Sequence, residues 1–225
     1  MASTVESTVT APSQAKTDEQ PVFLAWFERH RKAVSYGTTA VLVVLIVGWL
    51  FRETGRRKEA AAADALERGR AAFESGNLPS ASTEFQRVTQ SYSGTDAAFQ
   101  AELGLNEVRL ASGQTQIAVD ELRKFVGKNP PAYFASGAYG LMGGALENLK
   151  KFDEAAQAYK QAAEIATEDY RRVDALLGEA RALRLASKDK ESIDVLRSIV
   201  SKFGKDVPGV AEAQVRLAER TGGTM

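Results

Sequence analysis

The sequence repeats every 37 residues over most of its length, and this period restricts the chain to a small set of folds. Polar turns at residues 76–81, 113–118, 150–155 and 187–192 each end in a small side chain. These small residues are Ala81, Ala118, Ala155 and Ser192. Four residues later comes a large apolar or aromatic side chain, which is Phe85, Leu122, Tyr159 or Leu196. Because residues four apart share one face of a helix, each turn is predicted to begin a helix that packs through this face.

An earlier helix is predicted in each unit as well. Twelve residues before the aligned small residue stand the compact side chains Gly69, Asn106, Gly143 and Ala180. Small side chains at this position would allow two helix backbones to approach closely. The polar or glycine-containing turn between the two segments is typical of a helical hairpin. Residues 207–220 carry a shorter helical pattern, which predicts a helix that caps the last unit.

These residues resemble the tetratricopeptide repeat. The third unit matches the family pattern through Tyr139, Gly143, Phe152, Asp153, Glu154, Ala155, Tyr159 and Ala162. The second unit adds Leu105, Gly113, Ala118 and Pro130. The chain departs from the pattern at Asn106, where the family prefers glycine, and at Ser192, where it prefers alanine. Its period of 37 residues also differs from that of the family, which repeats about every 34 residues. The resemblance implies a right-handed α-solenoid of four helical hairpins, here with a C-terminal capping helix. Together with the N-terminal transmembrane helix predicted below, this gives an all-α fold.

Ahead of the repeats lies an uncharged apolar stretch at residues 33–51. At about 1.5 Å per residue a helix of this length spans the roughly 30 Å hydrocarbon core of a bilayer. Trp26 and Phe27 precede the stretch, and Trp49 and Phe51 lie at its C-terminal end. Aromatic rings prefer the headgroup level, which these positions would occupy. A cleaved signal peptide is the alternative, but the stretch is long, begins far from the N-terminus and lacks a small-residue cleavage pattern. The sequence therefore predicts a transmembrane helix.

The predicted organisation has five parts. Residues 1–21 are polar without an apolar period and are expected to form a disordered tail. Residues 22–32 form an amphipathic and basic juxtamembrane segment, residues 33–51 the transmembrane helix, residues 52–59 a basic connector and residues 60–225 the repeat domain. Basic residues flank both ends of the span, so their number does not determine its orientation. They are Arg29, Arg31, Lys32, Arg52, Arg56, Arg57 and Lys58.

The order of these parts resembles a family of bacterial inner-membrane proteins, the ancillary subunits of the Sec translocon. The resemblance covers residue 22 to the end and rests on four successive features. These are the segment FLAWFERHRK, a single span, the segment GRRKEAAAADAL and the repeats. In that family the short N-terminus is cytoplasmic and the repeats are periplasmic. The resemblance implies the same location in the inner (cytoplasmic) membrane for this single-pass chain. It also implies translocon subunits, chaperones or unfolded clients as partners.

Stacked hairpins form a concave surface that the first helix of each unit lines. The resemblance implies a protein-binding groove at Arg70, Phe73, Glu107, Leu110, Asn148, Arg181 and Arg184. Such a mixture of charged and apolar side chains suits an extended peptide or a partner helix. The alternative is that these side chains are solvated helix surface without a ligand. For Tyr133, Phe134 and Tyr139, core packing is favoured over a peptide-anchoring patch.

Composition excludes several functional classes. The chain has no cysteine, which removes disulfides, thiolate zinc sites and catalytic thiols. Its 29 basic and 29 acidic residues give no net field to attract nucleic acid. His30 is the single histidine, so no Ser/His/Asp arrangement is expected, and phosphate-binding motifs are missing. We expect no enzyme, cofactor or metal site, and two roles stay open: an adaptor at the translocon, or a structural, self-associating scaffold of an envelope complex.

Val44→Lys is expected to cost about 2.5–3.5 kcal/mol at the centre of the predicted span. The ten most apolar residues of the span contribute about 3–6 kcal/mol in favour of insertion before the polar residues are subtracted. Much of the variant should therefore leave the membrane, whereas Val44→Leu should remain. Carbonate extraction of membranes measures the difference, and full retention of the lysine variant would contradict the transmembrane assignment.

Overall fold

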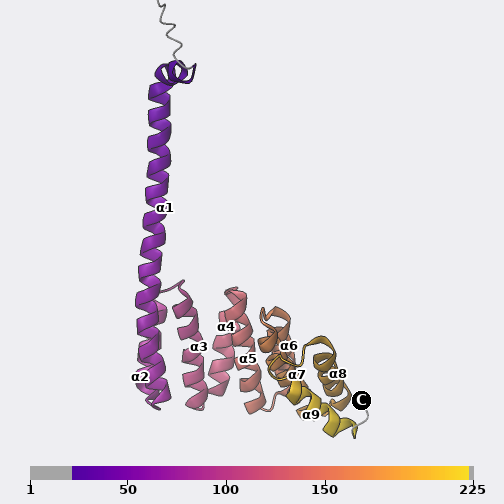
Figure 1. Ribbon diagram of the computed structural model, residues 1–225. Helices are drawn as coiled ribbons and strands as arrows, with labels where there is room; N and C mark the ends of the chain where they lie inside the picture. Colours follow the sequence, from indigo (N-terminus) through magenta and orange to yellow (C-terminus); the bar gives the residue numbers. More distant parts are fainter. Residues whose placement is uncertain (1–21, 223–225) are drawn as a thin grey trace, which may run out of the picture. The chain divides into compact units, whose positions relative to one another are not determined.

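A computed structural model describes residues 22–222, and every helix or strand assigned in that range is an α-helix (Figure 1). The helices are α1 (Val22–Glu74), α2 (Leu78–Ser91), α3 (Asp96–Ala111), α4 (Thr115–Gly127), α5 (Ala132–Asn148), α6 (Phe152–Ile165), α7 (Asp169–Leu185), α8 (Asp189–Lys202) and α9 (Val210–Thr221). The chain divides into two compact units between Thr54 and Gly55. The predicted all-α fold with a solenoid of helical hairpins is confirmed.

The first unit consists, in its described part, of α1 up to Thr54. By length and composition, the described helix Arg29–Glu74 is long and apolar enough to cross a membrane. Its apolar side chains are exposed, as Val44 is at 69%. The hydroxyls of Thr38 and Thr39 donate to the Ser35 carbonyl oxygen at 3.0 and 2.8 Å, so these polar groups bond within the helix.

Some predictions lie outside the described residues. The tail at residues 1–21 is one of them. The predicted headgroup positions of the Trp26, Phe27 and Phe51 side chains are others, because these side chains are outside the described part.

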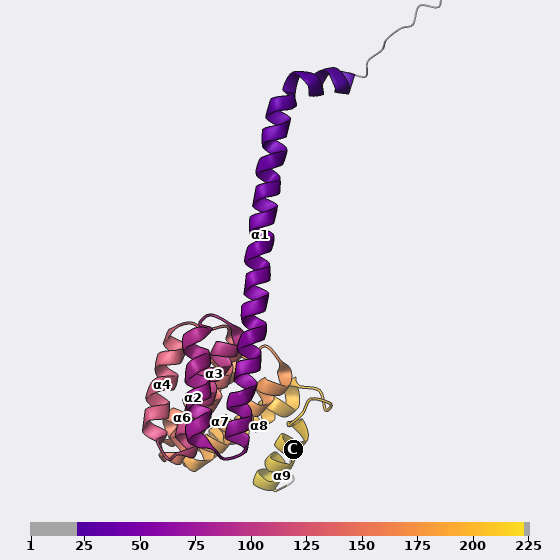
Figure 2. The ribbon, with the colours of Figure 1, turned by 90° about the vertical axis from the view of Figure 1, so that its left-hand side faces the viewer.

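The second unit begins at Gly55 and holds helices in pairs that recur with the sequence period. We use the term first helices for α3, α5, α7 and the part of α1 that follows Gly55. The second helices are α2, α4, α6 and α8. The second helices begin 37 residues apart, at Leu78, Thr115, Phe152 and Asp189. Figure 2 shows α2, α4 and α6 along one side of this unit. The repeat in the sequence is therefore a repeat of helical hairpins.

A left-handed residue ends each first helix and sets the hairpin turn. Gly76, Gly113, Lys150 and Ser187 have φ angles of +77°, +74°, +58° and +63°. The next backbone N–H donates back to a carbonyl five residues earlier, for example Asn77 to Ala72 at 2.9 Å and Lys188 to Leu183 at 2.9 Å. This bond satisfies carbonyls that the helix end leaves open. Lysine and serine replace the preferred glycine in the last two turns, at a cost of about 1–2 kcal/mol each.

Two aromatic rings determine how closely the helices pack. A methyl group placed on Gly69 or Gly104 would lie 2.6 or 2.8 Å from the Phe85 ring. The same group on Gly143 or Gly178 would lie 2.8 or 2.7 Å from the Tyr159 ring. Each ring therefore fills the space between the first helix of its own unit and that of the next. The other two units place leucines, Leu122 and Leu196, at this position.

The aligned small residues form the tightest part of the core. Ala81, Ala118, Ala155 and Ser192 are fully buried. Ser192 is tolerated because its hydroxyl donates to the Ala180 carbonyl oxygen at 2.6 Å. Asn106 is also buried, with its side-chain amide donating to the Glu102 carbonyl oxygen at 2.9 Å. Both polar departures from the repeat pattern thus have hydrogen-bond partners.

The two ends of the second unit are closed differently. At the C-terminal end, Val210, Ala213 and Leu217 of α9 pack in one cluster with Leu196 and Ile199 of α8, so α9 is the predicted cap. At the other end, the carboxylate of Glu59 accepts from the backbone N–H groups of Asp96 and Ala97 at 3.2 and 3.1 Å. Lys58 donates to the Ser93 carbonyl oxygen at 2.9 Å. Residues 58–59 of the predicted connector are therefore helical and bonded to the start of α3.

Gly178→Ala is expected to destabilise the fold by about 1–3 kcal/mol, because its Cβ would meet the Tyr159 ring. Gly140→Ala is the matched control, since a Cβ at that helical position meets nothing within 4 Å. The control should be neutral or more stable by up to about 1 kcal/mol. Chemical unfolding of the full chain in detergent, followed by circular dichroism, measures both. Equal stability of the two variants would refute the close packing of the Tyr159 ring against Gly178.

Candidate functional site

A groove of about 900 Å³ opens along the first helices of the second unit. It is lined mainly by α5 and α7, with Leu110 of α3 and the beginning of α9 at its edges. Gly137, Gly140 and Gly144 line it from one face of α5, at spacings of three and four residues. The equivalent residues of α3 and α7 carry side chains; they are Gln100, Leu103, Glu107, Asp174, Leu177 and Arg181. At these three positions α5 therefore has no side chain to fill the groove.

One wall of the groove is a hydrogen-bonded network between three helices. Arg181 of α7 donates from Nε to the two carboxylate oxygens of Glu147 at 3.1 and 3.2 Å. A second nitrogen of Arg181 donates to the Tyr159 hydroxyl at 2.9 Å. Burial raises the pKa of Tyr159, and the charge of Glu147 raises it further. The phenol thus stays neutral, and the network presents a fixed arginine to the groove.

Two exposed aromatic rings lie around Arg171, which lines the groove together with Tyr170. Tyr133 and Tyr170 are 43% and 48% exposed. The guanidinium of Arg171 lies 3.7 Å from the centroid of the Tyr133 ring, a cation–π contact, and donates to the Tyr170 hydroxyl at 3.2 Å. Phe134 is instead buried and stacks on Phe99 with 5.3 Å between ring centroids. Of the predicted aromatic group, Phe134 therefore belongs to the core and Tyr133 to the surface.

The structure gathers part of the predicted groove set around this cavity. Leu110, Asn148 and Arg181 line the groove. The other four residues, Arg70, Phe73, Glu107 and Arg184, do not line it. Phe73 packs against the core between α1, α2 and α3, and Arg70 donates to Gln100 and Glu67. Burial raises the pKa of the Glu107 carboxyl, and the nearby Arg70 opposes this effect.

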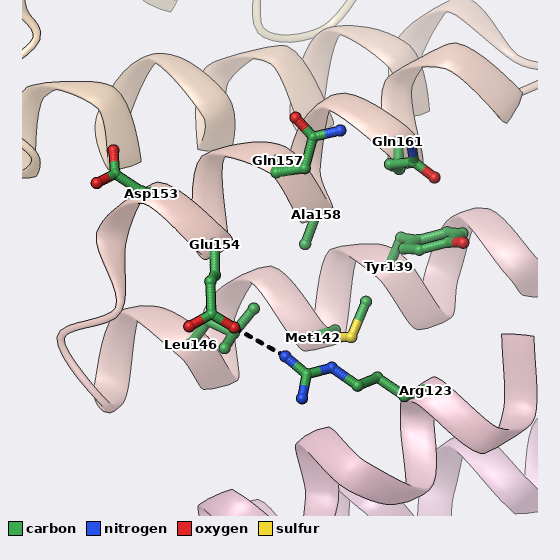
Figure 3. Close-up of a pocket in the computed structure, with 9 residues that line it drawn as sticks. All are labelled: Arg123, Tyr139, Met142, Leu146, Asp153, Glu154, Gln157, Ala158 and Gln161. Carbon is green, nitrogen blue, oxygen red and sulfur yellow. Dashed lines mark hydrogen bonds and ion pairs between the residues drawn. The ribbon is translucent and has the colours of Figure 1, made fainter.

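Sequence reasoning missed a second hollow, of about 440 Å³, between the second helices α4 and α6. Its apolar lining consists of Tyr139, Met142, Leu146 and Ala158, and we name it the outer pocket. Arg123 of α4 and Glu154 of α6 form an ion pair of 2.8 Å at its edge (Figure 3). No signal in the sequence marked these residues, because at helical spacing they look like ordinary core positions.

Glu179 occupies in α7 the repeat position that Met142 occupies in α5, 37 residues earlier. Within residues 22–222 its carboxylate makes no hydrogen bond or ion pair. Burial raises its pKa to about 7; Lys160 opposes this shift and Glu164 adds to it. The repeat thus places a poorly solvated carboxyl where its neighbouring unit has an apolar side chain.

The described residues contain no cluster of three or more His, Asp or Glu positioned to hold a metal.

The stability of Glu179→Gln relative to the parent chain should rise as pH increases from about 4.5 to about 7. The folded chain binds the Glu179 proton more tightly than the unfolded chain, so protonation of Glu179 stabilises the folded parent chain. This stabilisation is fully present below about pH 4.5 and is lost as pH rises through about 7. Denaturant titrations at several pH values measure the difference. Glu121→Gln is the control with a smaller trend of opposite sign, because the hydrogen bond from Lys124 lowers the pKa of that half-exposed carboxyl. A pH-independent difference for the Glu179 variant would contradict the assignment.

Comparisons with known proteins agree with this architecture. The model of a family described as a tetratricopeptide repeat-like domain matches residues 25–130 and 51–177. A structure described as the nearly identical TPR-like repeats of a kinesin light chain from Podosopora anserina is 18% identical, with a TM-score of 0.58 over 73% of this chain and 87% of that one. The MamA protein is 18% identical, with a TM-score of 0.53 over 72% and 83%. The search of curated proteins gave no match. From the family match over more than half its length, this chain belongs to the tetratricopeptide repeat-like domain family.

Proposed function

We propose that this chain is a membrane-anchored adaptor that binds segments of other proteins in the groove of its repeat domain. Repeats of this family typically form non-catalytic scaffolds for protein–protein interaction. The observation that carries the proposal is the groove of about 900 Å³ on the first helices. Its lining mixes glycine, leucine, tyrosine and paired charges, a composition that suits a polypeptide better than a small metabolite.

The groove favours close approach of a partner's backbone or side chains. Gly137, Gly140 and Gly144 line the groove without side chains, and a Cβ at Gly140 would meet nothing within 4 Å. Arg181 and Arg171 at its sides are already held by Glu147 and by Tyr133, so little side-chain entropy is lost when a partner contacts them. Such preorganised arginine and tyrosine side chains are common at the centres of protein interfaces.

The anchor in this proposal is the apolar part of α1, residues 33–51, which would hold the chain in the lipid bilayer. Its support is the length and apolar composition of the described helix Arg29–Glu74. We further propose, from the resemblance to ancillary subunits of the Sec translocon, that the N-terminus is cytoplasmic and the repeats are periplasmic in the bacterial inner membrane. The partners would then be channel subunits, chaperones or newly translocated chains.

Gly140→Trp should abolish partner binding without unfolding the domain. A Cβ at Gly140 meets nothing within 4 Å, so the indole extends into the groove rather than into the core. The measurement is copurification of the translocon channel subunits with the full chain in mild detergent. Gly140→Ala is the matched control and should copurify like the parent. Copurification unchanged by the tryptophan would exclude the groove as the binding surface.

Two further outcomes separate this proposal from the alternatives. Self-association of the chain without channel subunits would favour a structural scaffold of the envelope instead. Protease treatment of intact and lysed spheroplasts tests the orientation. The proposal expects the repeat domain to be digested in intact spheroplasts, where the periplasmic face is accessible, and protection until lysis would place it in the cytosol.

A further inference from the structure

Most of the charged side chains that line the groove are paired within the repeat domain. Among residues 22–222, the basic residues of the lining are three arginines, and each forms an ion pair with a carboxylate. The ion pairs are Arg181 with Glu147, Arg216 with Glu212 and Arg171 with Glu168. An anionic group of a partner would have to displace one of these carboxylates to gain an arginine. The described part of the groove therefore offers an anion no unpaired cation.

Asp174 of α7 is the exception among these charges. Its side chain lines the groove and is exposed, and within residues 22–222 it makes no hydrogen bond or ion pair. In the free protein water solvates this carboxylate. A partner that fills the groove would remove part of that water, and a carboxylate that loses water without gaining a counter-charge is costly. Binding in the groove therefore favours a partner that brings a cation to Asp174.

We propose that the groove selects polypeptide segments that place a lysine or arginine beside Asp174. This selectivity rests on the function proposed for the groove, and it names the chemistry of the partner. The basic side chain supplies the counter-charge that the repeat domain does not provide. Acidic segments are disfavoured, because they would meet an unpaired carboxylate of like charge.

The unpaired charge is particular to one unit of the repeat. The positions equivalent to Asp174 in the other first helices are Ala63, Gln100 and Gly137, and all three are neutral. A partner can therefore satisfy Asp174 in one register along the solenoid. The charge thus determines where the basic residue of the partner binds, and not only whether the partner binds.

The glycines of α5 give a partner's backbone access to this position. Gly137 is the α5 equivalent of Asp174, and a Cβ at Gly140 would meet nothing within 4 Å. Because glycine has no side chain, a partner's backbone can approach α5 closely here. Arg181, the other charged residue on this face of α7, follows Asp174 by seven residues, or about 10.5 Å along the helix. Arg181 is occupied by Glu147, so Asp174 is the residue of this face that is open to a partner's charge.

The test uses the full chain in nanodiscs of neutral lipid, which do not attract basic peptides by charge. The probe is a library of short random peptides displayed on phage, and empty nanodiscs remove peptides that bind lipid. Peptides that bind the parent chain but not Gly140→Trp are assigned to the groove. They are then synthesised with a fluorescent label, and anisotropy gives their dissociation constants for each variant.

We expect the groove-binding peptides to be enriched in lysine or arginine relative to the unselected library. Glutamate in place of the selected basic residue should weaken binding at least about tenfold. Asp174→Asn should remove the preference for lysine over glutamine at that position, and Asp174→Lys should reverse the preference in favour of glutamate. Asp64→Asn is the matched control, since this exposed aspartate does not line the groove, and it should preserve the preference. Asp174 is exposed and unpaired within residues 22–222, so its variants should melt like the parent.

Two results would overturn this selectivity, and they have different consequences for the function proposed above. Groove-binding peptides that lack a basic residue, or that bind Asp174→Asn as tightly as the parent, would refute the role of Asp174 and leave the groove as the binding surface. Failure to select any peptide that distinguishes the parent from Gly140→Trp would count against peptide binding in the groove itself, and the selectivity would fail with it.

Discussion

The structure depends on the fit of a second helix between two first helices. A single hairpin leaves an apolar face uncovered, and in this fold the next unit covers it. Phe85 and Tyr159 carry out this packing in alternate units, and each ring is in contact range of a glycine on both sides. Because a methyl group at any of those glycines would overlap the ring, the ring size and the glycine positions constrain one another. Helix spacing, and so the surfaces between helices, follows from this fit.

Helix α5 shows how packing and binding surfaces arise from one sequence element. Gly143 faces the Tyr159 ring, while Gly137, Gly140 and Gly144 line the groove. The same Tyr159 hydroxyl accepts a hydrogen bond from Arg181, so the groove wall is fixed to the core ring. The glycines thus have two effects: close helix packing on one face and an open groove on another.

Charged side chains of the repeat domain differ in whether they have a partner of opposite charge. The groove contains arginines that are paired or stacked, as in the contact of Arg181 with Glu147. The edge of the outer pocket is also paired, through Arg123 and Glu154. Glu179 differs because burial is the largest influence on the pKa of its carboxyl, and the charge of Lys160 offsets it only in part.

The sequence by itself determined the hairpins, their period and the buried small residues, because helix periodicity and turn chemistry act over a few neighbouring residues. It also identified Gly69 and Gly143 within their own hairpins. Tertiary structure alone revealed Gly104 and Gly178, since each packs against a ring from the preceding unit. It likewise decided that Leu110, Asn148 and Arg181 line the groove while Arg70 and Arg184 do not. A cavity depends on which side chains are missing across several helices, and no local pattern in the sequence records that.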